Sequence, residues 1–170
     1  MIKKKSTKIE GVYILQNVSH ADSRGLFREV WNKNTIEDLQ LNCSFNQDNI
    51  CISKKDVIRG LHFQNKPHEQ LKYVQVIQGS ILDIAVDLRR QSLTFGQHIA
   101  LEISNNNNMG LWIPKGFAHG FLALEDNTIV TYKCAGKYSK KHEQTIKWND
   151  PDLNINWGVN NPITSTKDNQ

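Results

Sequence analysis

Apolar and polar residues alternate along residues 57–87, and this pattern constrains the fold more than any other feature of the chain. Turn-forming residues at Gly60, Pro67 and Gly79 divide the stretch into two or three short segments. Alternation with a period of two is typical of β-strands, because successive side chains point to opposite faces of a sheet. The pattern therefore predicts short strands joined by turns, each with one face directed toward a hydrophobic interior.

Two ionisable residues fall on the apolar faces of these strands. The alternation places His62 on the face that carries Ile58, and it places Lys72 on the face of Val74 and Val76. Burying a charge is costly, so such groups need partners or a role. In one interpretation they form the acid and base machinery of a pocket. In the other, hydrogen bonds satisfy the histidine, and the lysine extends its charged end to the surface.

Similar short segments follow along the rest of the chain. The predicted strands cover residues 9–15, 44–53, 97–103, 109–113, 119–124, 128–134 and 144–148. One helix is predicted over residues 34–41, with Asn34 or Thr35 as its N-cap. Many short strands with few helices indicate an antiparallel sandwich or barrel. A chain of 170 residues that is 38% hydrophobic fits one domain over residues 1–170.

Charge and cysteine content argue against several functional classes. The formal net charge is +4 and includes the N-terminal run Lys3, Lys4 and Lys5, so we do not expect a nucleic-acid-binding protein. Three cysteines without CxxC spacing predict neither a disulfide framework nor a zinc site, and they fit a reducing cytoplasm. The N-terminus lacks the apolar segment of a signal peptide, and no later stretch is apolar enough to span a bilayer. We therefore expect a cytoplasmic protein without a membrane partner.

Tyr132 and His119 add two polar groups to the predicted interior. The alternation places Tyr132 on the inner face of its strand, where its hydroxyl needs a partner, although a tyrosine there is commonly only part of the core. Together, His62, Lys72, His119 and Tyr132 supply a base, a cation and an acid. This combination suits proton abstraction beside a carbonyl. The base takes a carbon-bound proton, the cation stabilises the enolate oxygen, and the phenol returns a proton.

Motifs throughout the chain resemble one enzyme family. They are DSRGLF (residues 22–27), RGLHFQ (59–64), LKYV (71–74), the segment 83–89, TFG (94–96), LWIPKGFAHGF (111–121), YKC (132–134), WNDP (148–151) and STKD (165–168). Their order and spacing closely resemble the dTDP-4-dehydrorhamnose 3,5-epimerase family of deoxysugar biosynthesis. The resemblance implies an all-β, cupin-type double-stranded β-helix, or jelly roll, with one or two short helices. It also implies a homodimer that uses no metal and no organic cofactor.

The resemblance further implies an activity and a set of site residues. The expected reaction converts dTDP-4-dehydro-6-deoxy-D-glucose to dTDP-4-dehydro-L-rhamnose by removing and returning protons at C3 and C5, beside the C4 ketone. His62 matches the general base, and Asp168 matches the carboxylate that orients it. Tyr132 matches the proton donor, and Lys72 matches the group near the C4 oxygen. Positions that match contacts to the nucleotide-sugar substrate are Arg24, Glu29, Gln47, Asn49, Arg59, Lys72, His119, Glu143 and Lys167, and Tyr138 matches an aromatic residue that stacks on thymine.

Three alternatives remain open at this level. A metal-dependent cupin enzyme would need a His-x-His pair, a nearby carboxylate and a later histidine, whereas His62 is followed by Phe63 and Gln64. A non-catalytic sugar-binding module would keep the aromatic and polar groups but would need no base. Within the family, an epimerase that inverts only C3, or one for another nucleotide 4-keto-sugar, would keep the same catalytic residues.

Overall fold

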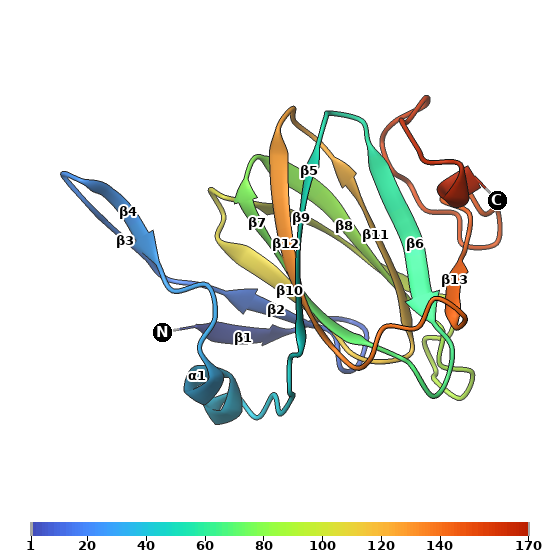
Figure 1. Cartoon of the computed structure of the whole chain (residues 1–170), viewed down its shortest axis with the longest axis horizontal. Coiled ribbons are helices and arrows are strands. Elements are labelled where there is room, and N and C mark those ends of the chain that lie inside the picture. The colour runs from blue at the N-terminus through green and yellow to red at the C-terminus, as the bar shows by residue number, and fades with distance from the viewer. Residues whose placement is uncertain (1, 170) are drawn as a thin grey trace.

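Two antiparallel β-sheets packed face to face form the body of the protein (Figure 1). The computed structural model describes residues 2–169. Its strands are β1 (Lys3–Ser6), β2 (Tyr13–Gln16), β3 (Ser19–Asp22), β4 (Gly25–Arg28), β5 (Gln47–Ser53), β6 (Ile58–Gln64), β7 (Leu71–Gln78), β8 (Ser80–Asp87), β9 (His98–Ser104), β10 (Met109–Ile113), β11 (Phe117–Ala123), β12 (Thr128–Ala135) and β13 (Glu143–Thr145). The helices are α1 (Lys33–Asp38) and the short 3-10 helix η1 (Lys167–Asn169). The predicted all-β class with one or two short helices is confirmed.

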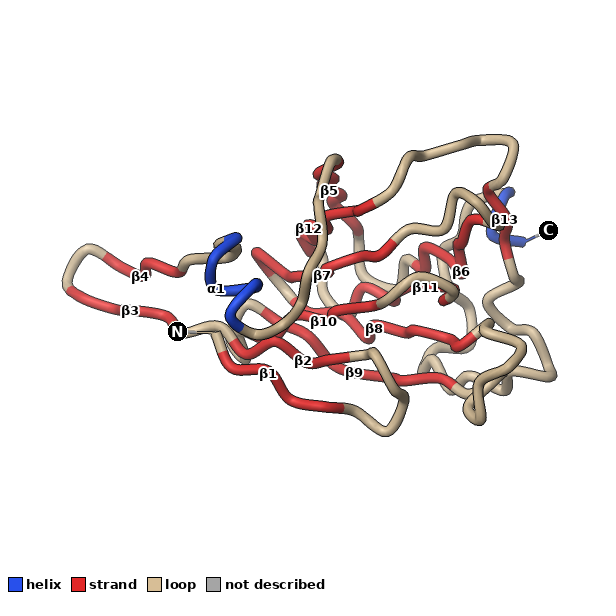
Figure 2. The backbone as a smooth tube through the Cα atoms, turned by 90° about the horizontal axis from the view of Figure 1, so that it is seen from below, coloured by secondary structure: helices blue, strands red, loops and turns tan. Residues whose placement is uncertain are grey.

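The order of strands brings distant parts of the chain together. One sheet has six strands in the order β1-β2-β10-β7-β12-β5, and the other has five in the order β13-β6-β11-β8-β9. A third pair, β3 and β4, forms a separate hairpin that extends away from both sheets (Figures 1 and 2). The two or three strands predicted within residues 57–87 are found as β6, β7 and β8, of which β6 and β8 lie in the five-stranded sheet and β7 lies in the six-stranded sheet.

The main hydrophobic core lies between the two sheets. Val74 and Val130 extend into it from the six-stranded sheet, and Ile81 and Ala85 extend into it from the five-stranded sheet. Because side chains alternate along a strand, each inner face contributes about every second residue. Removing these side chains from water is the main stabilising contribution to the fold. The predicted inner face of β12 is confirmed, since Tyr132 packs against this core beside Val130.

The predicted common face of His62 and Ile58 is wrong. Ile58 and Leu61 both pack into a second apolar cluster, which also contains Trp157. An unbroken strand would place residues three apart on opposite faces. Arg59 and His62 instead both line a cavity on the inner side of β6. The alternation along β6 therefore shifts by one residue between the two pairs.

A bulge at Gly60 explains this shift. The register between β6 and β11 changes between His119 and Phe121, as it does at a β-bulge. Gly60 has a φ of +127°, and a Cβ at this position would lie 2.5 Å from the Cα of Gly120. Only glycine tolerates both this conformation and this close approach. The bulge therefore directs His62 into the space between the sheets.

Two predictions near the N-terminus are also wrong. Residues 9–15 are not one strand, because residues 10–11 form a turn and β2 begins only at Tyr13. The N-cap of α1 is Asn32, whose side chain accepts hydrogen bonds from the backbone N–H groups of Asn34 and Thr35. Asparagine is a favoured capping residue, so the capping chemistry was expected but its position was not. Within residues 2–169, no helix has the length and apolar character needed to cross a membrane.

Candidate active site

A cavity of about 220 Å³ lies against the inner faces of both sheets. Its wall is formed by Cys51, Arg59, His62, Lys72, His119, Phe121, Tyr132, Ser165 and Asp168. These residues belong to β5, β6, β7, β11, β12 and the C-terminal segment. The structure therefore brings His62, Lys72, His119 and Tyr132 together at one site, with Asp168 beside them.

His62 and Asp168 form a hydrogen-bonded pair in this wall. The distance from His62 Nε2 to Asp168 Oδ1 is 2.6 Å, and the Ser165 hydroxyl donates to Asp168 Oδ2 at 2.8 Å. Burial alone would raise the pKa of Asp168, but the hydrogen bonds from His62 and Ser165 lower it below its ordinary value. Asp168 is thus an ionised acceptor for Nε2–H. The other ring nitrogen, Nδ1, is left to take a proton.

Lys72 places an ammonium group next to this pair. Its Nζ donates a hydrogen bond to the backbone oxygen of His62 at 3.4 Å. Among residues 2–169, Lys72 forms no ion pair within 4 Å. Burial lowers its pKa, while the negative groups Asp83 and Glu143 and the nearby Cys134 oppose that shift. A cation held in a poorly solvated wall without a direct counter-ion is suited to stabilise a developing oxyanion.

Tyr132 faces the cavity from the opposite sheet to His62. Tyr132 lies on β12 of the six-stranded sheet, whereas His62 lies on β6 of the five-stranded sheet. Burial raises the pKa of Tyr132 to about 12, and the neighbouring thiols of Cys51 and Cys134 add to this effect. The phenol is therefore protonated at neutral pH. A ligand between the sheets would have a base on one side and a proton donor on the other.

His119 is paired with a carboxylate that the sequence analysis did not assign to the site. The distance from His119 Nε2 to Asp83 Oδ1 is 2.7 Å, and the two residues are 6% and 0% exposed. Burial lowers the pKa of His119 although Asp83 opposes this, so the imidazole is neutral. The sequence carries a signal for Asp83, because alternation along β8 places it with Ile81 and Ala85 on the inner face.

A set of polar residues lies in a narrow recess next to the cavity. His62 and Lys72 line this recess together with Tyr138 and Glu143. Glu143 Oε1 lies 2.8 Å from Lys167 Nζ, and the Tyr138 hydroxyl donates to Glu143 Oε2 at 3.2 Å. Burial would raise the pKa of Glu143, but the hydrogen bond from Lys167 lowers it. The predicted residues Tyr138, Glu143 and Lys167 thus form one connected cluster beside the catalytic candidates.

The edge strand β5 contributes amides on the side of Tyr132. Asn49 lies opposite Tyr132 in the β5–β12 register, and its Nδ2 donates to the Tyr132 backbone oxygen at 3.4 Å. Gln47 Nε2 donates to Asn49 Oδ1 at 3.0 Å. Arg59 Nε donates to Ser53 Oγ at 3.1 Å, and Arg59 also lines the cavity. Gln47 and Asn49 lie along β5 beside the backbone of β12, and of these three predicted residues only Arg59 lines the cavity itself.

Comparisons with known proteins show which family this site belongs to. The family model described as dTDP-4-dehydrorhamnose 3,5-epimerase matches residues 6–170. The chain belongs to this epimerase family. The dTDP-4-dehydrorhamnose 3,5-epimerase of Shigella flexneri is 42% identical over 163 residues, which cover 95% of this chain and 90% of the relative.

Solved structures of the epimerase family have the same fold. The dTDP-4-dehydrorhamnose 3,5-epimerase of Bacillus anthracis str. Ames, crystallised with TDP and PPi bound, has a TM-score of 0.96, 44% identity and coverage of 99% of this chain and 97% of that one. A Legionella pneumophila Philadelphia 1 epimerase in complex with dTDP-4-keto-L-rhamnose has a TM-score of 0.94, 38% identity and coverage of 99% and 90%. The predicted family, jelly-roll fold and isomerase class are confirmed.

Two predicted substrate contacts of this epimerase lie apart from the cavity. Arg24 is at the tip of the β3–β4 hairpin, where its guanidinium pairs with Asp22 at 2.6 Å. Glu29 follows the hairpin and accepts a hydrogen bond from Asn32 at 3.0 Å. Figure 1 shows the hairpin on the left of the molecule, and β6, β13 and the C-terminus on the right. Within one chain, the structure does not bring Arg24 or Glu29 to His62.

Potential metal ligands are not clustered in the part of the chain that the structure describes. Across residues 2–169, no three histidine, cysteine, aspartate or glutamate side chains are grouped in a way that could hold a metal ion. The two histidines of the cavity each pair with a single carboxylate, His62 with Asp168 and His119 with Asp83.

Proposed function

We propose that this epimerase converts dTDP-4-dehydro-6-deoxy-D-glucose to dTDP-4-dehydro-L-rhamnose. The observation that carries the proposal is a single cavity with the His62–Asp168 pair in one wall and Tyr132 in the opposite wall. Inversion beside a ketone needs a base on one face of the sugar, an acid on the other and stabilisation of the enolate oxygen. Membership of the dTDP-4-dehydrorhamnose 3,5-epimerase family supports this reaction.

His62 acts as the base in this mechanism. Its Nδ1 takes the acidic proton from C3 or C5, and the electron pair of the broken C–H bond moves toward the C4 oxygen. Asp168 accepts Nε2–H and stabilises the imidazolium that forms, because a buried carboxylate favours a neighbouring positive charge. Lys72 stabilises the enolate oxygen, since no carboxylate among residues 2–169 forms an ion pair with its ammonium group.

Tyr132 completes each inversion from the opposite face. Its phenol gives a proton to the carbon that His62 deprotonated, and the carbonyl forms again. Its pKa of about 12 keeps the proton available at neutral pH. Between the two inversions His62 releases its proton to solvent and Tyr132 takes one from solvent, so the same pair of residues acts once at C3 and once at C5. The reaction therefore exchanges two carbon-bound hydrogens with solvent.

The remaining site residues bind the substrate in this proposal. Tyr138 stacks on the thymine base, and Lys167 and Arg59 contact the diphosphate, for which ammonium and guanidinium groups are suited. The other proposed contacts are Gln47, Asn49, His119 and Glu143. The connected contacts among Tyr138, Glu143 and Lys167 support a common role in holding the nucleotide.

Deuterium exchange tests the reaction directly. The enzyme is incubated with dTDP-4-dehydro-6-deoxyglucose in deuterated water, and deuterium is counted at C3 and C5 by NMR. Incorporation at both carbons with formation of the L-rhamno product supports the proposal. Incorporation at C3 alone assigns the chain to C3-only epimerases, and no incorporation indicates another substrate or a binding module.

We also propose that catalysis needs no metal or organic cofactor, because Lys72 supplies the charge that stabilises the enolate. Turnover is expected to stay within about twofold of its starting value after exhaustive treatment with EDTA. The measurement compares initial rates before and after chelation, with metal content checked by elemental analysis. Loss of turnover that only a divalent ion restores would contradict the assignment of Lys72.

We propose that the chain works as a homodimer in which Arg24 and Glu29 serve the site of the partner. The β3–β4 hairpin supports this arrangement, because it extends away from its own cavity and exposes Leu26 and Phe27, which are 61% and 70% exposed. Apolar side chains at the tip of a projecting hairpin favour burial against another protein surface. A symmetric dimer would give both cavities the same contact.

Mixing two inactive variants tests this arrangement. Arg24→Ala and His62→Ala homodimers are each expected to have low activity, and mixing after mild dissociation is expected to restore about a quarter of the wild-type activity. Half of the randomly formed dimers are heterodimers, and each of these has one intact site. Rates are measured before and after subunit exchange, with native mass spectrometry to count heterodimers. Heterodimers without restored activity would place Arg24 in the same site as its own His62.

We propose that residues 1–170 act as one domain in the cytoplasm. The family match over residues 6–170 and the common core between the sheets support a single domain. The three cysteines Cys43, Cys51 and Cys134 are free, which is compatible with a reducing compartment.

A further inference from the structure

Strand β8 carries two buried carboxylates on its inner face. Asp83 and Asp87 are both 0% exposed, and they are four residues apart, so they point to the same side of the strand as Ala85 between them. Buried carboxylates are costly unless their oxygens are hydrogen-bonded. Their partners therefore indicate what each carboxylate does.

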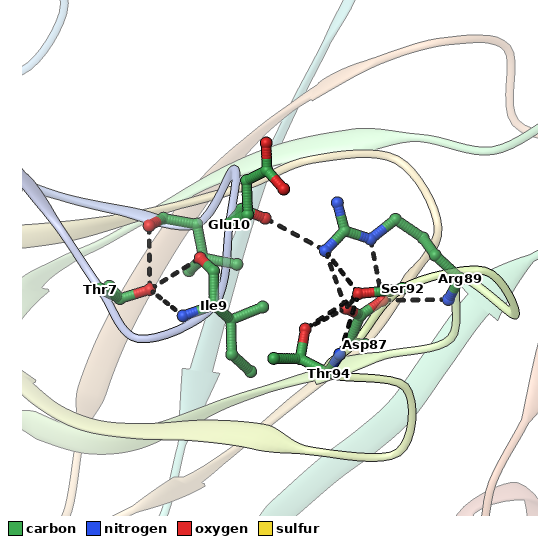
Figure 3. Close-up of polar contacts among 8 residues, drawn as sticks. Thr7, Ile9, Glu10, Asp87, Arg89, Ser92 and Thr94 are labelled. Atoms are coloured by element: carbon green, nitrogen blue, oxygen red, sulfur yellow. Dashed lines mark hydrogen bonds and ion pairs between the residues drawn. The ribbon is translucent and has the colours of Figure 1, made fainter.

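Asp87 is held by a complete set of donors (Figure 3). Arg89 Nη2 lies 2.7 Å from Asp87 Oδ2, and the hydroxyls of Ser92 and Thr94 donate to the same oxygen at 2.6 Å and 2.7 Å. Arg89 also donates to the backbone oxygen of Glu10 at 3.1 Å. Burial would raise the pKa of Asp87, but these hydrogen bonds hold it well below its ordinary range. Asp87 thus ties the segment after β8 to the turn before β2, which is a structural role.

Asp83 has far fewer partners. Its Oδ1 accepts one hydrogen bond, from His119 Nε2 at 2.7 Å, and its Oδ2 has no partner among residues 2–169. No arginine or lysine forms an ion pair with it in the described part of the chain. Replacing both members of a buried pair with apolar residues often costs no stability, whereas removing one member leaves the other without its partner. The single contact of Asp83 therefore points to a role toward His119 and the cavity beyond it.

We propose that Asp83 is a positioning residue for the epimerisation, which fixes the tautomer of His119 and places a negative charge behind the cavity wall. With Nε2–H directed at Asp83, the unprotonated Nδ1 of His119 is available to accept a hydrogen bond from a sugar hydroxyl. A neutral amide at position 83 can donate a hydrogen bond to His119 Nε2, which favours the tautomer with its proton on Nδ1. This inference rests on the function proposed above.

The charge of Asp83 also acts on Lys72, because Asp83 contacts His119, and His119 and Lys72 line the same cavity. Burial lowers the pKa of Lys72; Cys134, Asp83 and Glu143 oppose the shift, and Lys167 adds to it. Without the charge of Asp83, the pKa of Lys72 falls further, so Lys72 loses its proton at lower pH. Burial raises the pKa of Tyr132 to about 12, so its phenol keeps its proton at moderately alkaline pH. Lys72 therefore sets the high-pH limit of activity. His119, faced by Asp83, Lys72 and His62, is already neutral and does not set this limit.

Nitrogen-15 NMR of the imidazole rings tests the tautomer without any substrate. In the wild-type protein at neutral pH, the His119 ring, assigned by its loss in His119→Gln, is expected to show a protonated Nε2 and a bare Nδ1. In Asp83→Asn, it is expected to show the Nδ1–H tautomer. A wild-type ring with the proton on Nδ1 would overturn the proposal. This measurement stands even if the enzyme proves to use another sugar.

Kinetics of Asp83→Asn test the effect on the reaction. We expect kcat/KM to fall by about 10–100-fold, as is typical when the residue that orients a functional histidine is changed. The high-pH limb of the rate profile is expected to move to lower pH. Affinity for dTDP is expected to be unchanged, because Tyr138, Glu143 and Lys167 adjoin the cavity separately. Activity within twofold of wild type, or an unmoved high-pH limb, would overturn the role.

Asp87→Asn is the matched control, since it removes an equally buried carboxylate from the same strand. It is expected to lower the Tm without moving the high-pH limb. Ser92→Ala, which removes one donor from the same network, replaces it if Asp87→Asn does not fold. A control that moves the limb as much as Asp83→Asn would show that the effect is structural and would overturn the proposal. If wild-type protein exchanges no deuterium into the dTDP sugar, the proposed function fails, and the NMR result still decides the role of Asp83.

Discussion

Replacing His62 with alanine is expected to abolish solvent exchange together with epimerisation. His62 combines a free basic nitrogen with a carboxylate partner at 2.6 Å on its other nitrogen and a position opposite Tyr132. His119 has a similar pair with Asp83, but it is buried, and burial lowers its pKa. Without His62, the proposed site loses the base that removes the carbon-bound proton. Both rates are expected to fall by about 10²–10⁴-fold, the loss typical for a general base. Deuterium incorporation at C3 and C5, followed by NMR, measures the effect.

His98→Ala provides the matched control for this substitution. His98 lies on β9, is partly buried and does not line the cavity. Its replacement is expected to leave exchange within about twofold of wild type. Binding of dTDP to His62→Ala, measured by calorimetry, checks that the nucleotide contacts persist. Near-normal exchange in His62→Ala would show that another group is the base.

The strands were predictable because their signal is local. Alternation along β10 predicted residues 109–113, which are the bounds found, and the predicted ends of β12 and β9 lie within one residue of the observed ends. The same rule placed Tyr132 with Val130 and Lys72 with Val74 on inner faces. The alternation arises because one face of each strand is buried, so it can be recognised in a single sequence.

The face of His62 could not be predicted by that rule. The bulge at Gly60 depends on the close approach of Gly120 on the neighbouring strand, and this pairing lies some sixty residues away along the chain. Counting residues from Ile58 therefore gives the wrong face. The role of Asp83 was missed for a different reason. The alternation places Asp83 on the inner face with Ile81 and Ala85, but its hydrogen-bond partner His119 lies on another strand, which local patterns do not reveal.

The assembly of the cavity was also beyond local patterns. His62 and Asp168 are 106 residues apart in sequence, and only the packing of η1 against β6 brings their side chains together. Asp168 is only 3% exposed in this position, although it is close to the last residue of the sequence. Resemblance to the family named both residues, whereas periodicity named only His62. The role proposed for His62 is tested by His62→Ala.

Replacing Tyr132 with phenylalanine is expected to separate exchange from inversion. The substitution removes only the hydroxyl, and the ring continues to pack against the core between the sheets. His62 and Lys72 lie in other strands and Asp168 lies in η1, so all three keep their contacts. His62 can then still remove a proton and return a deuteron to the same face. Exchange without change of configuration is therefore expected at C3 and C5.

The size of the two effects distinguishes the acid from the base. Epimerisation by Tyr132→Phe is expected to fall by about 10²–10⁴-fold, as for loss of a general acid, while exchange falls by less than about tenfold. Single-turnover experiments in deuterated water, with NMR of recovered sugar, measure both rates in one sample. Tyr138→Phe is the control, because Tyr138 is half exposed and donates to Glu143 rather than lining the wall opposite His62. Epimerisation at the wild-type rate in Tyr132→Phe, with loss in Tyr138→Phe, would transfer the role of proton donor to Tyr138.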